Sequence, residues 1–190
     1  RFESTNKTEI WELPVIKGSP EKIYKELLVN PGPMFQGMLT SKYALEKIDY
    51  LDESIVSYQE WDTSIRLSKI CNFHWINEPL FIYNIPKKIT SFKQKNTWIS
   101  GYFSIIKKNK LEILKHHGKK KFQNLIYESF KMVSNWGEWE LLASLHNNLK
   151  NELSRFQNIK ILFYKFTRTK ANKLYTLKLI IKKPIIGIKH

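Results

Sequence analysis

The sequence contains one cysteine, Cys71, among its 190 residues. A single cysteine excludes an internal disulfide and a zinc site built from cysteines, and it fits a reducing compartment. No apolar run approaches the roughly 18 residues that a membrane-spanning helix needs. We therefore expect a cytoplasmic location, with peripheral attachment to the inner face of the cell membrane left open.

Signatures of several catalytic classes are also missing. The sequence has no glycine-rich phosphate loop, no nucleophile elbow and no cysteine–histidine pair with the logic of a protease. On a helix, the adjacent His116 and His117 would diverge by about 100°, which makes a poor metal site and favours a charge role at a helix C-terminus. His74 lies within an apolar run, so we expect a hydrogen-bonded core histidine. The chain begins at Arg1 without a basic-then-apolar leader, and we expect a fragment.

Positive charge is abundant but uneven. The net charge is +15, and hydrophobic residues make up 42% of the chain, enough for a packed core. Residues 1–92 hold 11 Lys/Arg against 12 Asp/Glu, a balance of −1, whereas residues 93–190 hold 21 against 5, a balance of +16. This asymmetry predicts two parts with different roles, the second facing an anionic partner.

The first part alternates between helix and strand patterns. Ser19 as N-cap and Pro20 at the first helical position predict a short helix, and two further helices are expected at 41–48 and 57–70. Apolar stretches bounded by turn residues predict a strand or buried loop at 9–16, a buried strand at 33–41, and one strand or two short strands at 72–85. We therefore expect an α/β domain, of which residues 1–92 are the last portion.

The second part, residues 93–190, has the pattern of successive helices. Apolar residues with helical spacing predict one face at Trp98, Tyr102, Ile105 and Ile106 and another along residues 122–133, as in a helical hairpin or small bundle. In residues 164–189, lysines are interleaved with aliphatic and aromatic residues. That mixture suits a segment lying on an anionic membrane surface, and a soluble extension that packs on the first part is the alternative.

One helix start allows two interpretations. Ser57 and Glu60 have the spacing of a capping box, and Asp62 and Arg66 have that of a helical ion pair. Trp61 would then belong to the core. In this interpretation Glu60 only stabilises the helix.

A wider set of motifs favours a catalytic interpretation. LDE at 51–53, QEWD at 59–62, RL at 66–67 and EPL at 78–80, followed by Tyr83, occur in an order that closely resembles family 2 glycosyltransferases. The resemblance covers roughly residues 33–92 and implies the C-terminal portion of a GT-A fold, followed by an all-α extension. It implies an inverting transfer of a sugar from a nucleotide-sugar donor to a glycan or lipid-linked acceptor, in polysaccharide or cell-envelope synthesis.

The same resemblance assigns roles to residues. Glu60 becomes the general base that takes the proton of the acceptor hydroxyl, a role worth about 10²–10⁴-fold in rate. Gln59, Trp61, Asp62, Gln36 and Gly37 become substrate-binding residues. A divalent Mg or Mn ion would be held by an Asp-x-Asp motif upstream, because residues 1–48 contain none. The family's histidine after the tyrosine is also absent, and Lys87 or Lys88 could meet a phosphate there or lie in a solvated loop. The fragment alone is therefore expected to be inactive.

A different class of function remains open. The basic half, with its aromatic residues, could bind nucleic acid or an anionic membrane surface without catalysis. Only two arginines occur in residues 93–190, and no known nucleic-acid-binding signature is present, so nucleic acid is the weaker of these partners.

Overall fold

The computed structural model describes residues 2–4, 7–9, 17–76, 78, 80, 83–84 and 92–172. The chain divides into two compact units, Arg1–Gly118 and Lys119–His190. These units do not coincide with the two predicted functional parts, 1–92 and 93–190, and that functional division stays a prediction.

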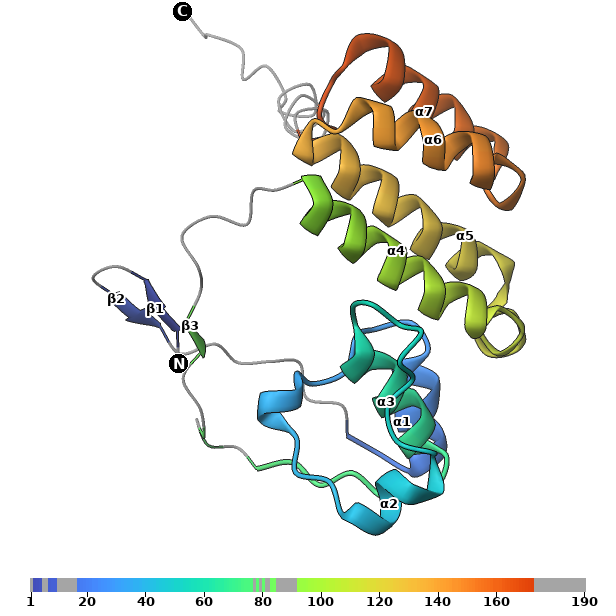
Figure 1. The fold of residues 1–190 in the computed structure, drawn as a ribbon. Coiled ribbons are helices and arrows are strands. Elements are labelled where there is room, and N and C mark those ends of the chain that lie inside the picture. Colours follow the sequence, from blue (N-terminus) through green and yellow to red (C-terminus); the bar gives the residue numbers. More distant parts are fainter. Residues whose placement is uncertain are drawn as a thin grey trace, which may run out of the picture. The chain divides into compact units, whose positions relative to one another are not determined.

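Helices dominate the described part of unit 1 (Figure 1). In chain order they are α1 (Pro20–Leu27), the 3-10 helix η1 (Phe35–Gly37), α2 (Lys42–Lys47), α3 (Gln59–Ser68), α4 (Phe92–Lys108) and the first turns of α5 (Lys110–Trp136). Gly118 interrupts α5 with a φ of 75° and a ψ of 170°. This positive φ suits a residue without a Cβ atom.

The described strands are very short. β1 (Phe2–Ser4) pairs antiparallel with β2 (Lys7–Glu9) and parallel with β3 (Tyr83–Asn84), in the order β2-β1-β3. Residues 17–76 and 92–172 contain no strand. Strands of two or three residues cannot build the layered parallel sheet of an α/β domain. The predicted α/β class, as a portion of a GT-A fold, is therefore wrong, and the fold of residues 17–76 and 92–172 is helical.

Two predicted strands account for this error. Within 33–41 the chain forms η1 and loops, and Leu39 is fully exposed there. Of the predicted strand or strands at 72–85, residues 83–84 form β3, whereas residues 72–76 have no regular structure and His74 is exposed rather than in the core. Short apolar runs indicate burial only when other elements cover them, and in unit 1 the described elements leave these runs open. The predicted strand at 9–16 lies almost entirely outside the described residues.

The core of unit 1 begins where α1 packs on α3. Ser19 caps α1 by accepting a hydrogen bond from the backbone N–H of Lys22, and Pro20 opens the helix, as predicted. Ile23 and Leu27 of α1 are buried, as are Trp61 and Ile65 of α3. This pairing of apolar faces fixes the orientation of α3 and of every side chain on it.

α4 packs on the N-terminal end of α3. Gly101 allows this approach, because a Cβ atom there would lie 2.5 Å from the carbonyl oxygen of Ser57. The Tyr102 ring lies beside the rings of Tyr58 and Trp61, with centroid distances of 6.0 and 5.5 Å. The predicted buried positions Tyr102, Ile105 and Ile106 are confirmed.

Unit 2 is a small helical unit (Figure 1). It contains the remainder of α5, then α6 (Trp139–Leu149), the 3-10 helix η2 (Lys150–Glu152) and α7 (Arg155–Thr167), with α7 packed along α6. The predicted apolar face of α5 is buried, and its residues are Phe122, Ile126, Phe130 and Val133. Within the described ranges, no helix combines the length and apolar content needed to cross a bilayer.

Candidate functional site

The N-terminus of α3 lacks the capping box that its sequence predicts. Tyr58 is the N-cap residue, with a φ of 62° and a ψ of 30°, and its side chain makes no capping hydrogen bond. Glu60 is half-buried in the first turn and has no hydrogen-bond or ion-pair partner among the described residues. Burial, and secondarily the negative charge of Glu60, raises the pKa of the Tyr58 phenol. Glu60 is thus a carboxylate without a structural partner in the described chain.

Asp62 has a structural role. Its side chain is 1% exposed, and its oxygens lie 2.7 Å from Nε of Arg66 and 2.8 Å from Nζ of Lys108. Lys108 also lies 2.7 Å from Asp52, so one ammonium joins two carboxylates. Burial opposes the positive charge, but the hydrogen bonds to Asp52 and Asp62 outweigh it and raise the pKa of Lys108. The predicted Asp62–Arg66 pair is therefore present and belongs to a cluster of four charges.

Trp61 is also used by the fold. The indole is fully buried, and its Nε1–H donates to the backbone carbonyl of Leu27. A side chain held in this way is not presented to a substrate. Gln59 lies in the same first turn as Glu60 and is half-buried.

The other predicted substrate residues lie elsewhere. Gln36 and Gly37 are exposed in η1, and no hydrogen bond joins them to Glu60 among the described residues. Gly37 lines a cavity to which the predicted residues of α3 do not contribute. The structure therefore does not bring the predicted substrate residues together around Glu60. Lys87 and Lys88 lie outside the described residues.

The structure does not test the predicted divalent ion, which was assigned to an Asp-x-Asp motif and to none of the residues named above. The described ranges contain no group of three His, Cys, Asp or Glu side chains that could hold an ion. The two adjacent histidines serve different partners: Nε2 of His116 lies 3.3 Å from Glu112, and Nε2 of His117 lies 2.7 Å from the carbonyl oxygen of Lys25.

α7 carries an apolar surface that sequence reasoning missed. The helix starts at a complete capping box between Ser154 and Gln157, and it buries Gln157, Ile161 and Tyr164. At about 100° per residue, five apolar side chains fall on the opposite side, within an arc of about 120°. We call this surface the α7 apolar face; its exposed fractions are Phe156 64%, Ile159 57%, Leu162 38%, Phe163 45% and Phe166 79%.

Basic residues border the α7 apolar face. Lys160 and Lys165 fall on either side of the arc, and Nζ of Lys160 lies 4.2 Å from the centre of the Phe156 ring. Residues 153–190 contain ten Lys/Arg and no Asp or Glu. The spacing 156, 159, 163 and 166 is the signal in the sequence for this face, whereas the predicted interfacial segment, 164–189, covers only its last residue.

No protein-family model, curated protein or solved structure matches the chain. Together with the helical fold, this overturns the predicted membership of family 2 glycosyltransferases. Two side chains of the QEWD motif, Trp61 and Asp62, are accounted for by core packing and by the charge cluster. Sugar transfer, a nucleotide-sugar donor and a divalent metal remain untested predictions. They were inferred from a GT-A fold that the structure does not have.

Proposed function

We propose that this protein is a basic helical module that binds the anionic surface of a lipid bilayer through α7. The observation that carries the proposal is the α7 apolar face, with Lys160 and Lys165 along its borders. An apolar stripe between cationic borders is the side-chain arrangement of a helix that lies in the plane of a membrane interface.

The apolar contribution comes from five side chains that face water in unit 2. Burial of apolar surface contributes about 25 cal/mol per Å², so inserting these side chains at the boundary of headgroups and acyl chains contributes on the order of several kcal/mol. Phe156 and Phe166, near the two ends of α7, are its most exposed aromatic residues. Insertion therefore involves the whole length of the helix.

The electrostatic contribution comes from the borders of the same helix. A lysine at the edge of an inserted helix can extend its ammonium to the phosphate layer while its methylenes stay among apolar groups. Each basic residue near an anionic leaflet contributes about 1 kcal/mol. Arg168 and Lys170, which follow the helix, add to Lys160 and Lys165; Arg155, at the first position of α7, falls within the arc itself, and no acidic side chain of α7 opposes these charges.

Lipid is favoured over nucleic acid by the chemistry of the face. Single-stranded nucleic acid is bound by aromatic rings on which bases stack, within a cationic groove. Ile159 and Leu162 offer no ring for stacking, and they form one continuous surface with the phenylalanines. The lone thiol of Cys71 and the anionic character of the inner leaflet support the cytoplasmic side of the membrane for the proposed contact.

The test compares vesicles of neutral phosphatidylcholine with vesicles that also contain phosphatidylserine. We expect the full chain to sediment with the anionic vesicles at low salt and to be released as salt is raised. Phe166→Asp should weaken this binding at least about tenfold, because it removes an inserted ring and adds a charge that the leaflet repels. Leu111→Asp is the matched control, since Leu111 is 80% exposed in unit 1 and the substitution makes the same change in charge.

Three results would overturn the proposal. Binding that is equal on neutral and anionic vesicles would remove the electrostatic part. Equal losses for Phe166→Asp and Leu111→Asp would show that net charge, and not α7, governs binding. The third result is a chain that does not bind vesicles. If Phe166→Asp then changes its oligomeric state, α7 contacts a second copy of the chain; if the chain instead binds an oligonucleotide in a salt-dependent way, nucleic acid is the partner.

A further inference from the structure

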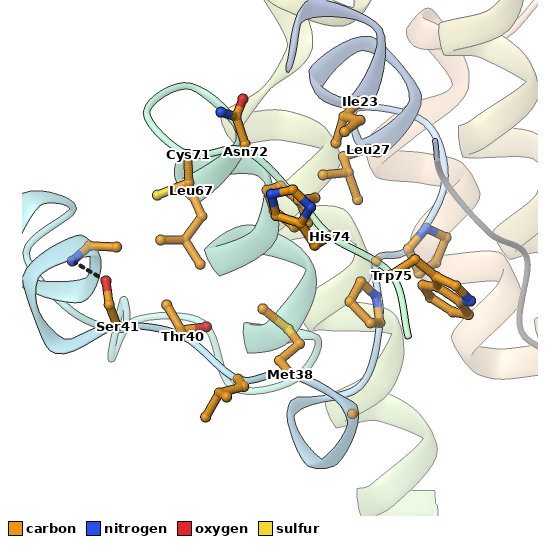
Figure 2. Close-up of a pocket in the computed structure, with 17 residues that line it drawn as sticks. Ile23, Leu27, Met38, Thr40, Ser41, Leu67, Cys71, Asn72, His74 and Trp75 are labelled. Atoms are coloured by element: carbon orange, nitrogen blue, oxygen red, sulfur yellow. Dashed lines mark hydrogen bonds between the residues drawn. The ribbon is translucent and has the colours of Figure 1, made fainter. Parts of the chain in front are cut away.

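A cavity of about 420 Å³ lies in unit 1 and has no assigned role. It is open to solvent in one part and is bordered by α1, by the chain from Pro31 to Ala44, by the C-terminal end of α3 and by residues 71–75. Figure 2 shows the His74 ring near the middle of the lining side chains, with Leu67 and Cys71 to one side and Trp75 to the other. This volume is in the range of small-molecule sites, about 300–1,000 Å³.

The lining carries no charged side chain. None of the residues that border the cavity is Lys, Arg, Asp or Glu. A charged ligand would lose its hydration there without gaining a counter-ion, which costs several kcal/mol. The cavity therefore selects for an uncharged molecule.

The walls are apolar and partly flat. Leu27 and Leu67 are buried at 1% and 2% exposure and form a rigid inner wall. Trp75 and Leu39, which are 37% and 103% exposed, remain open to solvent. An aromatic ring in the ligand would cover the indole of Trp75, and such a pair of aromatic rings contributes about 0.5–1.5 kcal/mol beyond the buried area.

A few polar side chains could orient a ligand. Thr40, Asn72 and His74 line the cavity and have no hydrogen-bond partner among the described residues. Ser41 differs, since its hydroxyl accepts the backbone N–H of Ala44, drawn as a dashed line in Figure 2. A hydroxyl, an amide and an imidazole together supply both donors and acceptors.

From these features we infer that the cavity binds an uncharged small molecule with an aromatic ring and hydrogen-bonding groups. The ring packs against the indole of Trp75, and the hydrogen-bonding groups of the ligand meet one or more of Thr40, Asn72 and His74, which lie at different places along the lining. This site lies entirely in unit 1 and is independent of the α7 apolar face in unit 2.

The probe for this site is N-phenyl-1-naphthylamine, which is uncharged and fluoresces strongly in apolar surroundings. We expect saturable binding by the full chain and at least a tenfold weaker affinity for Leu39→Asp, which places a charge on the wall. Leu39 is fully exposed, so the variant is expected to fold. Leu111→Asp, an equally charged change at an exposed leucine outside the lining, and Phe166→Asp on α7 should bind the probe like the unaltered chain.

A second readout uses the thiol that lines the cavity. Saturating probe should slow the reaction of Cys71 with N-ethylmaleimide at least threefold, because the occupied cavity blocks access. In a Cys71→Ser, Ser100→Cys control, the new thiol on the exposed side of α4 should react at the same rate with and without probe. Absence of saturable binding, equal affinity of Leu39→Asp and Leu111→Asp, loss of binding in Phe166→Asp, or an unprotected Cys71 would overturn the inference.

Discussion

The ammonium of Lys108 lies 2.8 Å from the carboxylate of Asp62, a side chain that is 1% exposed. Lys108 is on α4 and Asp62 is on α3, so this contact joins two helices by charge at the place where Gly101 lets them approach. Asp52 lies 2.7 Å from the same ammonium, so Lys108 also connects the loop that precedes α3 to α4. The charge cluster is therefore part of how unit 1 positions the start of α3.

Replacing Asp62 tests the structural role of this cluster. We expect Asp62→Asn to lower the free energy of unfolding by about 2–3 kcal/mol, because Arg66 and Lys108 would lose their shared, buried carboxylate. Glu53→Gln removes the same charge at an exposed position and should have almost no effect. Urea unfolding followed by tryptophan fluorescence gives both values. Equal, small losses would show that the cluster adds nothing to stability.

The loss of folding stability at acid pH should depend on Asp52. Hydrogen bonds from Lys108, and then from Ser54, hold the pKa of this carboxyl well below its usual range. A carboxyl whose pKa is lowered in the folded state stabilises the fold above its ordinary pKa, and this stabilisation is lost as the pH falls through the folded value. Stability should therefore fall below about pH 4.

The measurement is the urea midpoint of the unaltered chain and of Asp52→Asn from pH 7 down to pH 2. Asp52→Asn should be less stable at neutral pH and should show a shallower decline below pH 4. If both proteins lose stability with the same slope, the pair of Asp52 and Lys108 is not formed in solution.

The two serines that precede helices should behave differently. Ser57→Ala and Glu60→Gln should each change the free energy of unfolding by less than about 0.5 kcal/mol, because no capping box forms at α3. Ser154→Ala at the complete capping box of α7 should cost about 1 kcal/mol. Thermal unfolding of the three variants is the test. A loss at Ser57 as large as that at Ser154 would restore the capping interpretation of Glu60.

Local chemistry made the helices predictable. The start of α1 at Ser19 and Pro20, the Asp62–Arg66 pair and the buried face of α5 all follow from spacing within one or two turns. Such signals depend on neighbours along the chain, so they hold even when the surrounding fold is assigned incorrectly.

Burial was the part that the sequence could not decide. Phe35 and Leu39 lie in an apolar run, but whether such a run is a buried strand or an open loop depends on what packs over it. The α7 apolar face presents the opposite case, in which exposed apolar residues could not be distinguished from buried ones. Phe156 and Phe166 could have faced either side of α7, and only the packing on Ile161 and Tyr164 decides the side that meets water.

Gly101 should be intolerant of a side chain. An added Cβ atom would meet the carbonyl oxygen of Ser57 at 2.5 Å and must push α4 away from the loop before α3. We expect Gly101→Ala to lower the free energy of unfolding by about 1–3 kcal/mol, although alanine is the better helix former. Ser104→Ala, in the same helix, is the control and should be close to neutral. A stabilised Gly101→Ala protein would contradict this approach of α4.

The last prediction concerns a tyrosine pair in unit 2. The hydroxyl oxygens of Tyr127 and Tyr164 lie 2.8 Å apart, and Tyr164 is 4% exposed. Tyr127→Phe should lower the free energy of unfolding by about 1–2 kcal/mol, because the buried hydroxyl of Tyr164 would lose its partner. Tyr43→Phe, at a position that is 68% exposed, should be neutral.

The same tyrosine pair predicts how stability changes with pH in the alkaline range. Burial, together with the hydrogen bond to Tyr164, raises the pKa of Tyr127 above its usual range. A group whose pKa is raised in the folded state stabilises the fold below its ordinary pKa, and that contribution is lost as the pH rises toward the folded value. Stability of the unaltered chain should therefore decline above about pH 10, and Tyr127→Phe should flatten that decline. An unchanged slope in the variant would mean that Tyr127 ionises normally and is open to water.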